Sequence, residues 1–333
     1  MHEKLHYYLK KLSFYSEVYL GFFLRKTQKP YILFLKSNPY YNNDYLEWVK
    51  RKYPEVYCHF KIGLLRPFKA TLQGVGVLVN WANDSYRNDA QILEDIHVAA
   101  DKLGIPIINS QRVLGKLNKL EFSEVALKNG VRTPKMIRIN SDQSYDQIEC
   151  ALSSKFIVRC NMGNGVHSYR QLVTSQKDLW LVEWESMQDP IAIEFIDTID
   201  DNGYYNVYRH FFVGSKGILN YVSFSNKWCL HWHERDWSQE RLQKELEILN
   251  EPVKFQSQLN DLREDLKLDY VNFDYSVDMD GNIVVWEINT RPWIDFDDDS
   301  EREGNPAIYA RIEETFLEMT RLYLSKANIY LLI

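Results

Sequence analysis

The chain contains 333 residues, of which 45% are hydrophobic and 26% are charged. This composition is typical of a soluble globular protein, because a disordered chain has fewer apolar residues and a membrane protein has long apolar runs. The formal net charge of −6 argues against a dedicated nucleic-acid-binding protein, which usually has a basic excess. The four cysteines show no C-x-x-C spacing, so we expect neither a disulfide scaffold nor a structural zinc site, and a cytoplasmic location is favoured.

The first 30 residues are dominated by an apolar segment at positions 12–24. This segment contains Glu17 and is shorter than the ~20 apolar residues that a membrane span requires. No small-residue cleavage site of a signal peptide follows it. We therefore expect residues 1–30 to form an amphipathic helical segment packed on the body of the protein, and we expect no membrane span.

The next region alternates between strands and a helix. Short apolar runs typical of buried strands occupy residues 31–35, 76–80 and 105–108. The apolar periodicity of residues 88–103 predicts a helix, with Gly104 as its C-cap. Strand–helix–strand order with short connections implies a parallel sheet, so we expect an α/β domain over residues 31–112. The chain has no G-x-G-x-x-G motif, and a dinucleotide site of the usual kind has no support.

The remainder of the chain mixes strands and helices without a repeat. Apolar runs predict strands at residues 155–159, 191–196, 208–213 and 218–224. Helical periodicity predicts helices at residues 119–129, at 238–250, and from Pro306 to about Lys326.

A β-hairpin over residues 272–289 is the most informative segment. Asp280-Gly281 lies between two alternating runs, which predicts a two-residue turn. In the register that this turn fixes, Asp274 lies opposite Glu287. Asn272 then lies opposite Asn289 on the same face of the hairpin.

Two directly opposed carboxylates destabilise a sheet unless their repulsion is relieved. One pKa can be raised, a cationic side chain can be recruited, or a metal can bind. Two carboxylates and an amide oxygen, without histidine or cysteine, are hard ligands suited to Mg²⁺. Removing one carboxylate charge from the nucleotide-free protein is then expected to relieve a repulsion of about 0.2–1 kcal/mol. The alternative is an exposed polar face with a different register.

These strands resemble the metal-binding strands of the ATP-grasp superfamily. Its signature is an Asp on one strand and Glu-x-Asn on a later strand, often followed by proline, which Asp274, Glu287, Asn289 and Pro292 match. The resemblance extends from about residue 110 to 295 and includes four more segments in the family's order. These segments are Lys116–Lys119, Phe156–Arg159 with Gly163-Asn-Gly165, Ile191–Ile196 and Arg209–Gly214. Within the superfamily, the chain resembles carboxylate–amine/thiol ligases of the D-alanine–D-alanine ligase, glutathione synthetase and ribosomal-protein glutamate ligase type.

The resemblance implies a fold and a division of the chain. The fold is an α/β fold in which a parallel-sheet domain is followed by two α+β subdomains that clasp the nucleotide. The small lid subdomain is expected at residues 113–197. The large subdomain, with the metal-binding hairpin, is expected at residues 198–333.

The resemblance also implies roles for individual residues. Asp274, Glu287 and Asn289 would hold Mg²⁺, for which Mn²⁺ is a candidate substitute. The residues that would bind ATP are Lys116, Arg159, Gly163, Gly165, Glu194, Phe195, Ile196 and Asp201, with Asp200 as the alternative ribose ligand. Arg209 and Arg291 would bind the acceptor carboxylate or its acyl-phosphate. Two departures are that Arg159 stands where the family usually has lysine, and Asn272 stands where related ligases often have arginine.

The expected activity is an ATP-dependent ligation that forms a C–N bond. A small-molecule or peptide carboxylate becomes an acyl-phosphate, which an amine attacks, leaving ADP and phosphate. One alternative is a kinase that phosphorylates a hydroxyl, and another is a nucleotide-binding regulatory protein with little turnover. The sequence leaves a homodimer open.

Overall fold

The computed structural model of the chain describes residues 29–37, 44–65, 72–82, 86–110, 118–161, 170–187, 189–230, 234–290 and 306–333. The helical segment predicted at residues 1–30 lies outside this part of the chain, except for its last two residues. Contacts divide the chain into two compact units. Unit 1 draws on residues 1–114, 268–270 and 290–333, and unit 2 on residues 115–267 and 271–289. None of the described helices is both long and apolar enough to cross a membrane.

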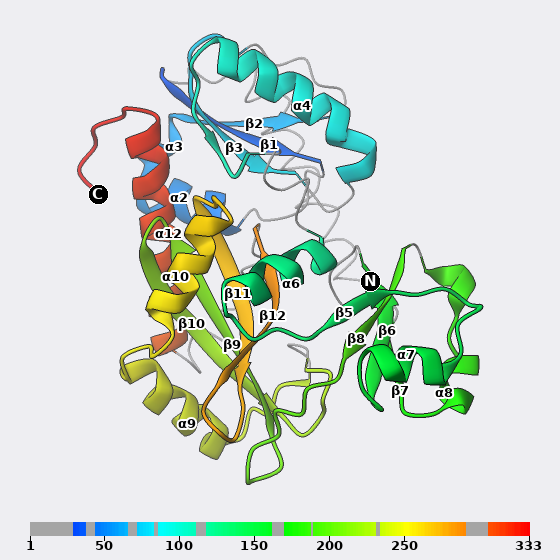
Figure 1. Ribbon diagram of the computed structural model, residues 1–333. Coiled ribbons are helices and arrows are strands. Elements are labelled where there is room, and N and C mark those ends of the chain that lie inside the picture. Colours follow the sequence, from blue (N-terminus) through cyan, green and yellow to red (C-terminus); the bar gives the residue numbers. More distant parts are fainter. Residues whose placement is uncertain are drawn as a thin grey trace, which may run out of the picture. The chain divides into compact units, whose positions relative to one another are not determined.

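Unit 1 is built on a four-stranded parallel sheet (Figure 1). Its strands, in the order β2-β1-β3-β4, are β1 (Tyr31–Lys36), β2 (Phe60–Leu64), β3 (Val75–Trp81) and β4 (Ile107–Ile108). Its helices include α2 (Asp44–Lys52), α3 (Pro54–Tyr57) and α4 (Tyr86–Lys102). The predicted parallel sheet is confirmed. The sequence analysis missed β2, because Lys61 and Gly63 interrupt its apolar run.

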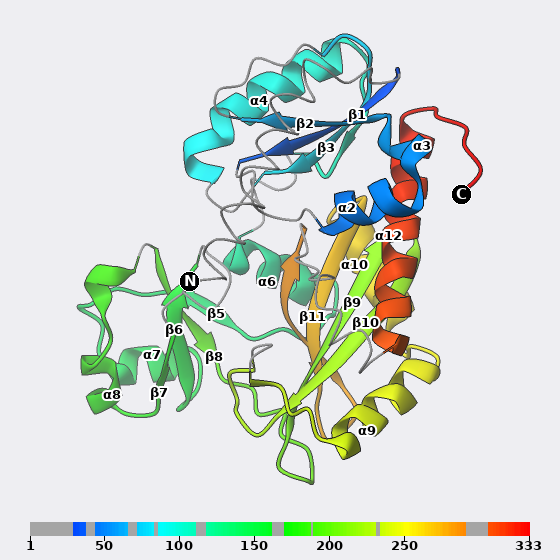
Figure 2. The same cartoon turned by 180° about the vertical axis from the view of Figure 1, so that it is seen from behind.

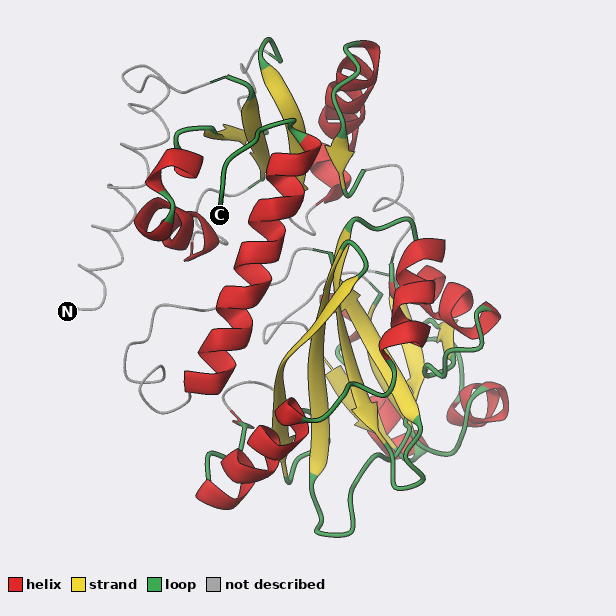
Figure 3. Cartoon of the chain, turned by 90° about the vertical axis from the view of Figure 1, so that its left-hand side faces the viewer, coloured by secondary structure: helices red, strands yellow, loops and turns green. Residues whose placement is uncertain are grey.

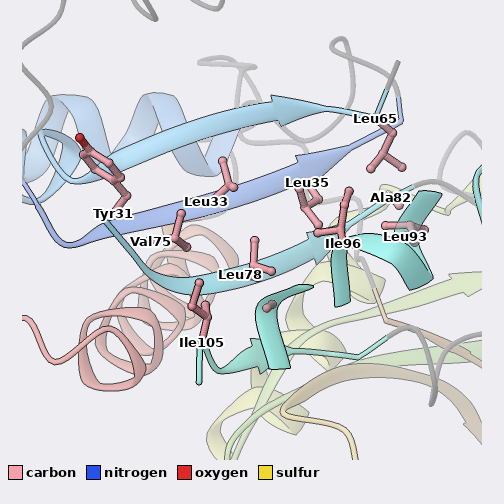
Figure 4. Close-up of a cluster of buried hydrophobic side chains, with 11 residues drawn as sticks. Tyr31, Leu33, Leu35, Leu65, Val75, Leu78, Ala82, Leu93, Ile96 and Ile105 are labelled. Atoms are coloured by element: carbon pink, nitrogen blue, oxygen red, sulfur yellow. The ribbon is translucent and has the colours of Figure 1, made fainter. Parts of the chain in front are cut away.

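Helix α4 covers one face of this sheet. Leu33 and Leu35 of β1 and Leu78 of β3 pack against Leu93 and Ile96 of α4 (Figure 4). The helix ends at Lys102, and Gly104 follows it closely, as predicted, with a φ of +65°, a left-handed conformation that glycine adopts without strain.

The other face of the sheet is aromatic, and helix α12 (Pro306–Lys326) packs against it (Figure 2). Phe34 of β1 meets Tyr323 of α12 edge to face, with ring centroids 5.5 Å apart. The Tyr45 hydroxyl is hydrogen-bonded to the Thr320 hydroxyl at 2.9 Å. These contacts place α12 in unit 1, whereas the sequence analysis grouped it with the metal-binding hairpin. The predicted bounds of the helix are confirmed.

Unit 2 contains two antiparallel-paired sheets. The lid sheet has the order β5-β8-β6-β7. It comprises β5 (Met136–Arg138), β6 (Phe156–Cys160), β7 (Arg170–Val173) and β8 (Pro190–Glu194). Phe156, Val158 and Val173 point from it into a core that Ile148 and Leu179 complete. Those last two residues lie on α7 (Tyr145–Ala151) and α8 (Gln176–Trp180), and the short helix η1 (Trp184–Ser186) follows.

The second sheet of unit 2 has the order β10-β9-β11-β12. Figure 3 draws its long strands in yellow. Its strands are β9 (Tyr205–Val213), β10 (Lys216–Ser225), β11 (Tyr270–Val277) and β12 (Ile283–Asn289). The remaining helices of the unit are α6 (Lys119–Lys128), α9 (Gln239–Asn250) and α10 (Gln256–Asp265). Helix α9 packs against β10, and α6 contacts both β12 and β5.

The β11–β12 hairpin differs from its prediction at the turn. Asn272 pairs with Asn289 and Asp274 with Glu287, as predicted, but beyond Asp274 the register slips by one residue. The two-residue turn was wrong: residues 278–282 connect the strands. The Asp278 carboxylate accepts hydrogen bonds from the backbone N–H groups of residues 280 and 282, which stabilises the longer loop.

Candidate functional site

Asp274 lies at the centre of a buried polar cluster on β11. It is 6% exposed. Arg209, on β9, donates from Nε to Asp274 Oδ1 at 2.9 Å and from Nη2 to Oδ2 at 3.1 Å. This two-bond geometry is the strongest form of an ion pair between arginine and a carboxylate. Burial lowers the pKa of Arg209, but the field of Asp274, the hydrogen bonds to it, and the fields of Tyr221 and Glu287 together outweigh burial, so this pKa is raised above its usual value.

Two amides complete the environment of this carboxylate. Asn272 donates from Nδ2 to Asp274 Oδ1 at 2.8 Å, and Asn289 donates from Nδ2 to Oδ2 at 2.9 Å. Asp274 therefore accepts four hydrogen bonds, two on each oxygen. Because an ionised carboxylate offers about four lone-pair sites, its accepting capacity is filled.

Glu287, opposite Asp274, is surrounded by cationic side chains. Lys119 Nζ is 3.8 Å from Glu287 Oε2. Burial raises the pKa of Glu287, but Lys119, Arg159, Arg170 and Arg209 together outweigh burial, so the pKa is lowered. The ionised form is thus favoured in the folded protein. This direction of shift argues against the expectation that removing the charge stabilises the nucleotide-free chain, because the cationic neighbours favour the charged form of Glu287.

A second pair of like charges lies in the lid sheet. Arg159 of β6 is directly opposite Arg170 of β7. Burial lowers the pKa of Arg159, and Arg170 lowers it further, while Glu287 opposes this effect. Arg170 also donates from Nη1 to Cys229 Sγ at 3.3 Å. Two opposed guanidinium groups destabilise a sheet in the absence of an anion.

Lys119 was not predicted as a site residue. It is the first residue of α6, whose start is fixed by a capping box between Asn118 and Glu121. The backbone N–H of Leu120 donates to Asn161 Oδ1 at 3.3 Å, which ties this helix to the end of β6. The signal was in the sequence, because an Asn followed three residues later by Glu marks a helix start and so fixes where Lys119 lies.

The predicted hinge residues lie at the end of β8, an inner strand of the lid sheet: Glu194 is its last residue, and Phe195 and Ile196 follow it. The Glu194 carboxylate accepts a hydrogen bond from the backbone N–H of Lys135 at 3.0 Å. Lys155 Nζ lies 3.7 Å from the centre of the Phe195 ring. Ile196 is buried. The three residues therefore differ in environment, and their role in adenine binding stays a prediction.

The two candidate ribose ligands have different surroundings. Asp200 accepts hydrogen bonds from the backbone N–H groups of Asn202 and Tyr204 and from Lys244 Nζ. Burial raises the pKa of Asp200, but the combined effect of these donors is larger, so the pKa is lowered. Asp201 is exposed. Asp200 therefore stabilises its own turn, which leaves Asp201 as the acid of the two that can contact a ligand.

Four predicted site residues lie outside the described part of the chain: Lys116, Gly163, Gly165 and Arg291. The residues that the structure does bring together are Arg159, Arg209, Asp274, Glu287 and Asn289, with Lys119, Arg170 and Asn272 as additional members.

The three predicted metal ligands are chemically suited to Mg²⁺. Asp274, Glu287 and Asn289 offer carboxylate and amide oxygens on neighbouring strands. Asn289, however, turns its amide nitrogen toward Asp274. A cation at Asp274 therefore requires that at least one donor of the cluster leave the carboxylate.

Comparisons with known proteins identify the fold. No protein-family profile matches the sequence, and no curated protein is significantly similar. D-alanine–D-alanine ligase from Bacillus anthracis, complexed with ATP, is 14% identical with a TM-score of 0.53, over 88% of this chain and 99% of its own. The macrocyclase MdnC from Microcystis aeruginosa MRC, bound with precursor peptide MdnA, is 14% identical with a TM-score of 0.57 over the same shares. The ATP-grasp ligase PsnB, complexed with minimal precursor, Mg and ADP, is 13% identical with a TM-score of 0.52, over 85% and 97%.

Proposed function

We propose that this chain, which has the ATP-grasp fold, is an ATP- and Mg²⁺-dependent ligase that joins a carboxylate to an amine. The observation that supports this most directly is the opposed pair Asp274 and Glu287, set among cationic side chains from three parts of unit 2. Phosphoryl transfer requires this combination of anionic and cationic groups, because the protein mainly positions and neutralises charge.

The acidic side of the cluster would hold the metal. Asp274, Glu287 and Asn289 would provide oxygen ligands once Asn289 turns its amide oxygen toward the ion. When bound, Mg²⁺ would neutralise the charge of the β- and γ-phosphate oxygens.

The cationic side would bind the phosphates. Arg159 and Arg170 each present a planar fork that can hold two phosphate oxygens. An anion between them would also relieve their mutual repulsion. Lys119 would contribute a third positive charge at Glu287. Lys116, Gly163 and Gly165 are proposed to approach the same phosphates from the entry segment and the glycine-rich loop.

The remainder of the nucleotide would lie at the hinge. Glu194, Phe195 and Ile196 are proposed to contact the adenine, and Asp201 the ribose hydroxyls. The exposed carboxylate of Asp201 suits hydroxyl donors, since the competing Asp200 already accepts from its own turn and from Lys244.

The acceptor carboxylate would bind to arginine. Related ligases often have an arginine two residues before the metal-binding Asp, where this chain has Asn272. Arg209 reaches Asp274 from the neighbouring strand instead. Arg209 is therefore proposed to replace the missing group, and Arg291 to assist it. A carboxylate oxygen attacks the γ-phosphorus and ADP leaves. The amine nitrogen then attacks the acyl carbon, phosphate leaves, and the nitrogen loses a proton.

The acceptor is proposed to be either a free amino acid or a peptide side chain. The name of D-alanine–D-alanine ligase describes the joining of two free amino acids, whereas the structures of MdnC and PsnB contain a precursor peptide and a minimal precursor. Both kinds of substrate therefore belong in the first screen.

The test is phosphate release from ATP with mixtures of amino acids and of peptides, followed by mass spectrometry. A ligase releases phosphate only when carboxylate and amine are both present, and its product is lighter than the two substrates by one water. Hydroxylamine supplied in place of the amine should trap the acyl-phosphate as a hydroxamate. Phosphate attached to a hydroxyl would show a kinase and would contradict the proposal. ATP binding without turnover in any mixture would favour a regulatory protein.

A further inference from the structure

The Arg209–Asp274 pair raises a question about the order in which ligands bind. Each oxygen of Asp274 already accepts two hydrogen bonds, and Arg209 supplies one of them on each oxygen. A metal ion cannot share a lone pair that a donor occupies. Binding of the metal and the contact with Arg209 therefore compete for the same carboxylate.

Asn289 frees one lone pair of Asp274 Oδ2 when it turns its amide oxygen toward the ion, but Arg209 still occupies a lone pair on each oxygen. Of the two donors that remain, Arg209 is the better able to leave. Asn272 is fully buried beside Asp274 on the same strand, so its amide is held by the sheet. Arg209 comes from β9 on a long side chain that is 26% exposed. Its guanidinium also lies over the ring of Tyr221, 5.4 Å from the ring centre, which gives the side chain a second favourable contact. A change of side-chain rotamer would release Asp274 without moving the sheet.

We propose that Arg209 is a positioning residue that acts as an internal cation, occupying Asp274 in the nucleotide-free protein and yielding it to the metal that arrives with ATP. This inference rests on the proposed function. Free metal then binds weakly, because it must displace a two-bond ion pair. The metal becomes competitive when phosphate oxygens add their own ligation.

The replacement of Arg209 by the metal at Asp274 also determines the order in which the nucleotide and the acceptor bind. While Arg209 holds Asp274, its donors are used within the protein. Once the metal has replaced it, the same guanidinium is available beside the metal for the acceptor carboxylate. Nucleotide and acceptor are therefore coupled through one side chain, and such couplings are typically worth about 5- to 150-fold in affinity.

A charge-matched variant separates this role from simple electrostatics. Arg209→Lys keeps the positive charge but cannot form the fork, because an ammonium is a point donor. Mn²⁺ affinity is measured by electron paramagnetic resonance on the nucleotide-free full chain. We expect the lysine variant to bind Mn²⁺ about 10-fold more tightly than the wild type, within the usual range of such couplings. The matched control is Arg263→Lys on α10, where the arginine pairs with Asn260 and Glu264, and its Mn²⁺ affinity should be unchanged.

Two results would overturn the proposal: equal Mn²⁺ affinity in the wild type and Arg209→Lys, or the same gain in the Arg263→Lys control. If the lysine variant does not fold, Arg209→Gln is measured in about 0.3 M salt, where long-range charge effects are screened. The same 10-fold gain is expected there, and no gain overturns the proposal. Calorimetry of Mg·ATP binding to the wild type tests the proposed function separately. A failure to bind Mg·ATP would refute the ligase and leave the Mn²⁺ comparison intact.

Discussion

Two antiparallel hairpins of unit 2 each place like charges directly opposite one another, and they compensate those charges differently. In β11–β12 the pair is Asp274 and Glu287, and in β6–β7 it is Arg159 and Arg170. The acidic pair is compensated within the protein, because its cationic neighbours outweigh burial and lower the pKa of Glu287. For Arg159, burial outweighs the field of Glu287, and its pKa is also lowered, which disfavours its charged form.

A lowered pKa therefore favours the charged form of Glu287 in one hairpin and disfavours the charged form of Arg159 in the other. The acidic hairpin is stabilised in its charged state before any ligand arrives. In the basic hairpin, burial disfavours the charged form of Arg159 even though Glu287 opposes this effect. We therefore expect a bound phosphate to stabilise the basic hairpin further, whereas a metal has to displace contacts in the acidic one.

The largest expected effect comes from breaking the acidic pair. Glu287→Gln should lower the turnover of the ligase by about 10²-fold or more, as the loss of a charge-stabilising group does. It should also lower the free energy of unfolding without ligand by about 1–3 kcal/mol, because buried cations lose their partner. Steady-state phosphate release and chemical denaturation measure the two effects. An unchanged or increased stability would contradict the compensation that we infer.

The basic pair should respond differently. Arg170→Met should weaken ATP binding about 10-fold or more, through loss of a charge-assisted contact worth about 1.5–3 kcal/mol. It should change the stability of the ligand-free protein by less than about 1 kcal/mol, because the loss of the repulsion from Arg159 is offset by the loss of the attraction to Glu287. Calorimetry with ATP and thermal melts test both parts. The control is Arg138→Met in the same sheet, an exposed arginine paired with Asp189, which should not alter ATP affinity.

The pH dependence of stability can test the compensation at Glu287 once the contribution of His210 has been removed. His210 is fully buried next to Arg209 on β9 and stacks on Phe212, with ring centroids 4.7 Å apart. Burial lowers the pKa of His210 from 6.5 to about 3. Between pH 6.5 and about 3, His210 is therefore protonated in the unfolded chain but not in the folded chain. Stability should fall as the pH drops below 6.5, by up to ~1.4 kcal/mol per pH unit.

His210→Leu should remove this slope. Denaturation at a series of pH values compares the variant with the wild type. The remaining acid dependence can then be compared with that of a His210→Leu, Glu287→Gln double variant, which isolates the contribution of Glu287. An unchanged slope in His210→Leu would show that His210 is not the group that titrates.

The smallest effect concerns the helix that carries Lys119 to the acidic pair. Asn118→Ala removes the N-cap of α6 and should lower the free energy of unfolding by about 1 kcal/mol. Ser144→Ala removes the equivalent capping box of α7 in the lid and should have a similar stability cost. Only Asn118→Ala should also weaken ATP binding by a few-fold, because it frays the turn that bears Lys119. Equal ATP affinities in the two variants would remove Lys119 from the nucleotide site.

The sequence predicted those features of the fold and site that depend on local pattern. The predicted turn placed Asp274 opposite Glu287, and this pairing is confirmed because the register shift beyond Asp274 compensates for the longer loop. Helical periodicity after Pro306 predicted the last helix, which ends at Lys326. The turn of the hairpin was missed because Asp278 caps a longer loop. The length of the loop therefore depends on the hydrogen bonds of the Asp278 side chain rather than on the turn propensity of Asp280-Gly281.

Contacts between residues far apart in the sequence were beyond prediction. Arg209 and Asp274 are 65 residues apart, and nothing in either segment identifies the other as its partner. Lys119 reaches Glu287 only because α6 packs against β12. The sequence could therefore name three ways to relieve the carboxylate pair, but only the structure identifies the cations that do so.

The discontinuity of unit 1 has a consequence for how the chain is made. The residues that cover the aromatic face of its sheet come last, since Tyr45 meets Thr320 across 275 residues of sequence. During synthesis every strand of unit 2 emerges before α12 does. Unit 2 can therefore reach its fold on the ribosome while Phe34 and Tyr45 still lack the helix that shields them. Such transiently exposed aromatic surface is prone to aggregation and is the kind of surface that chaperones bind, so the nascent chain should need protection until Tyr323 has left the exit tunnel.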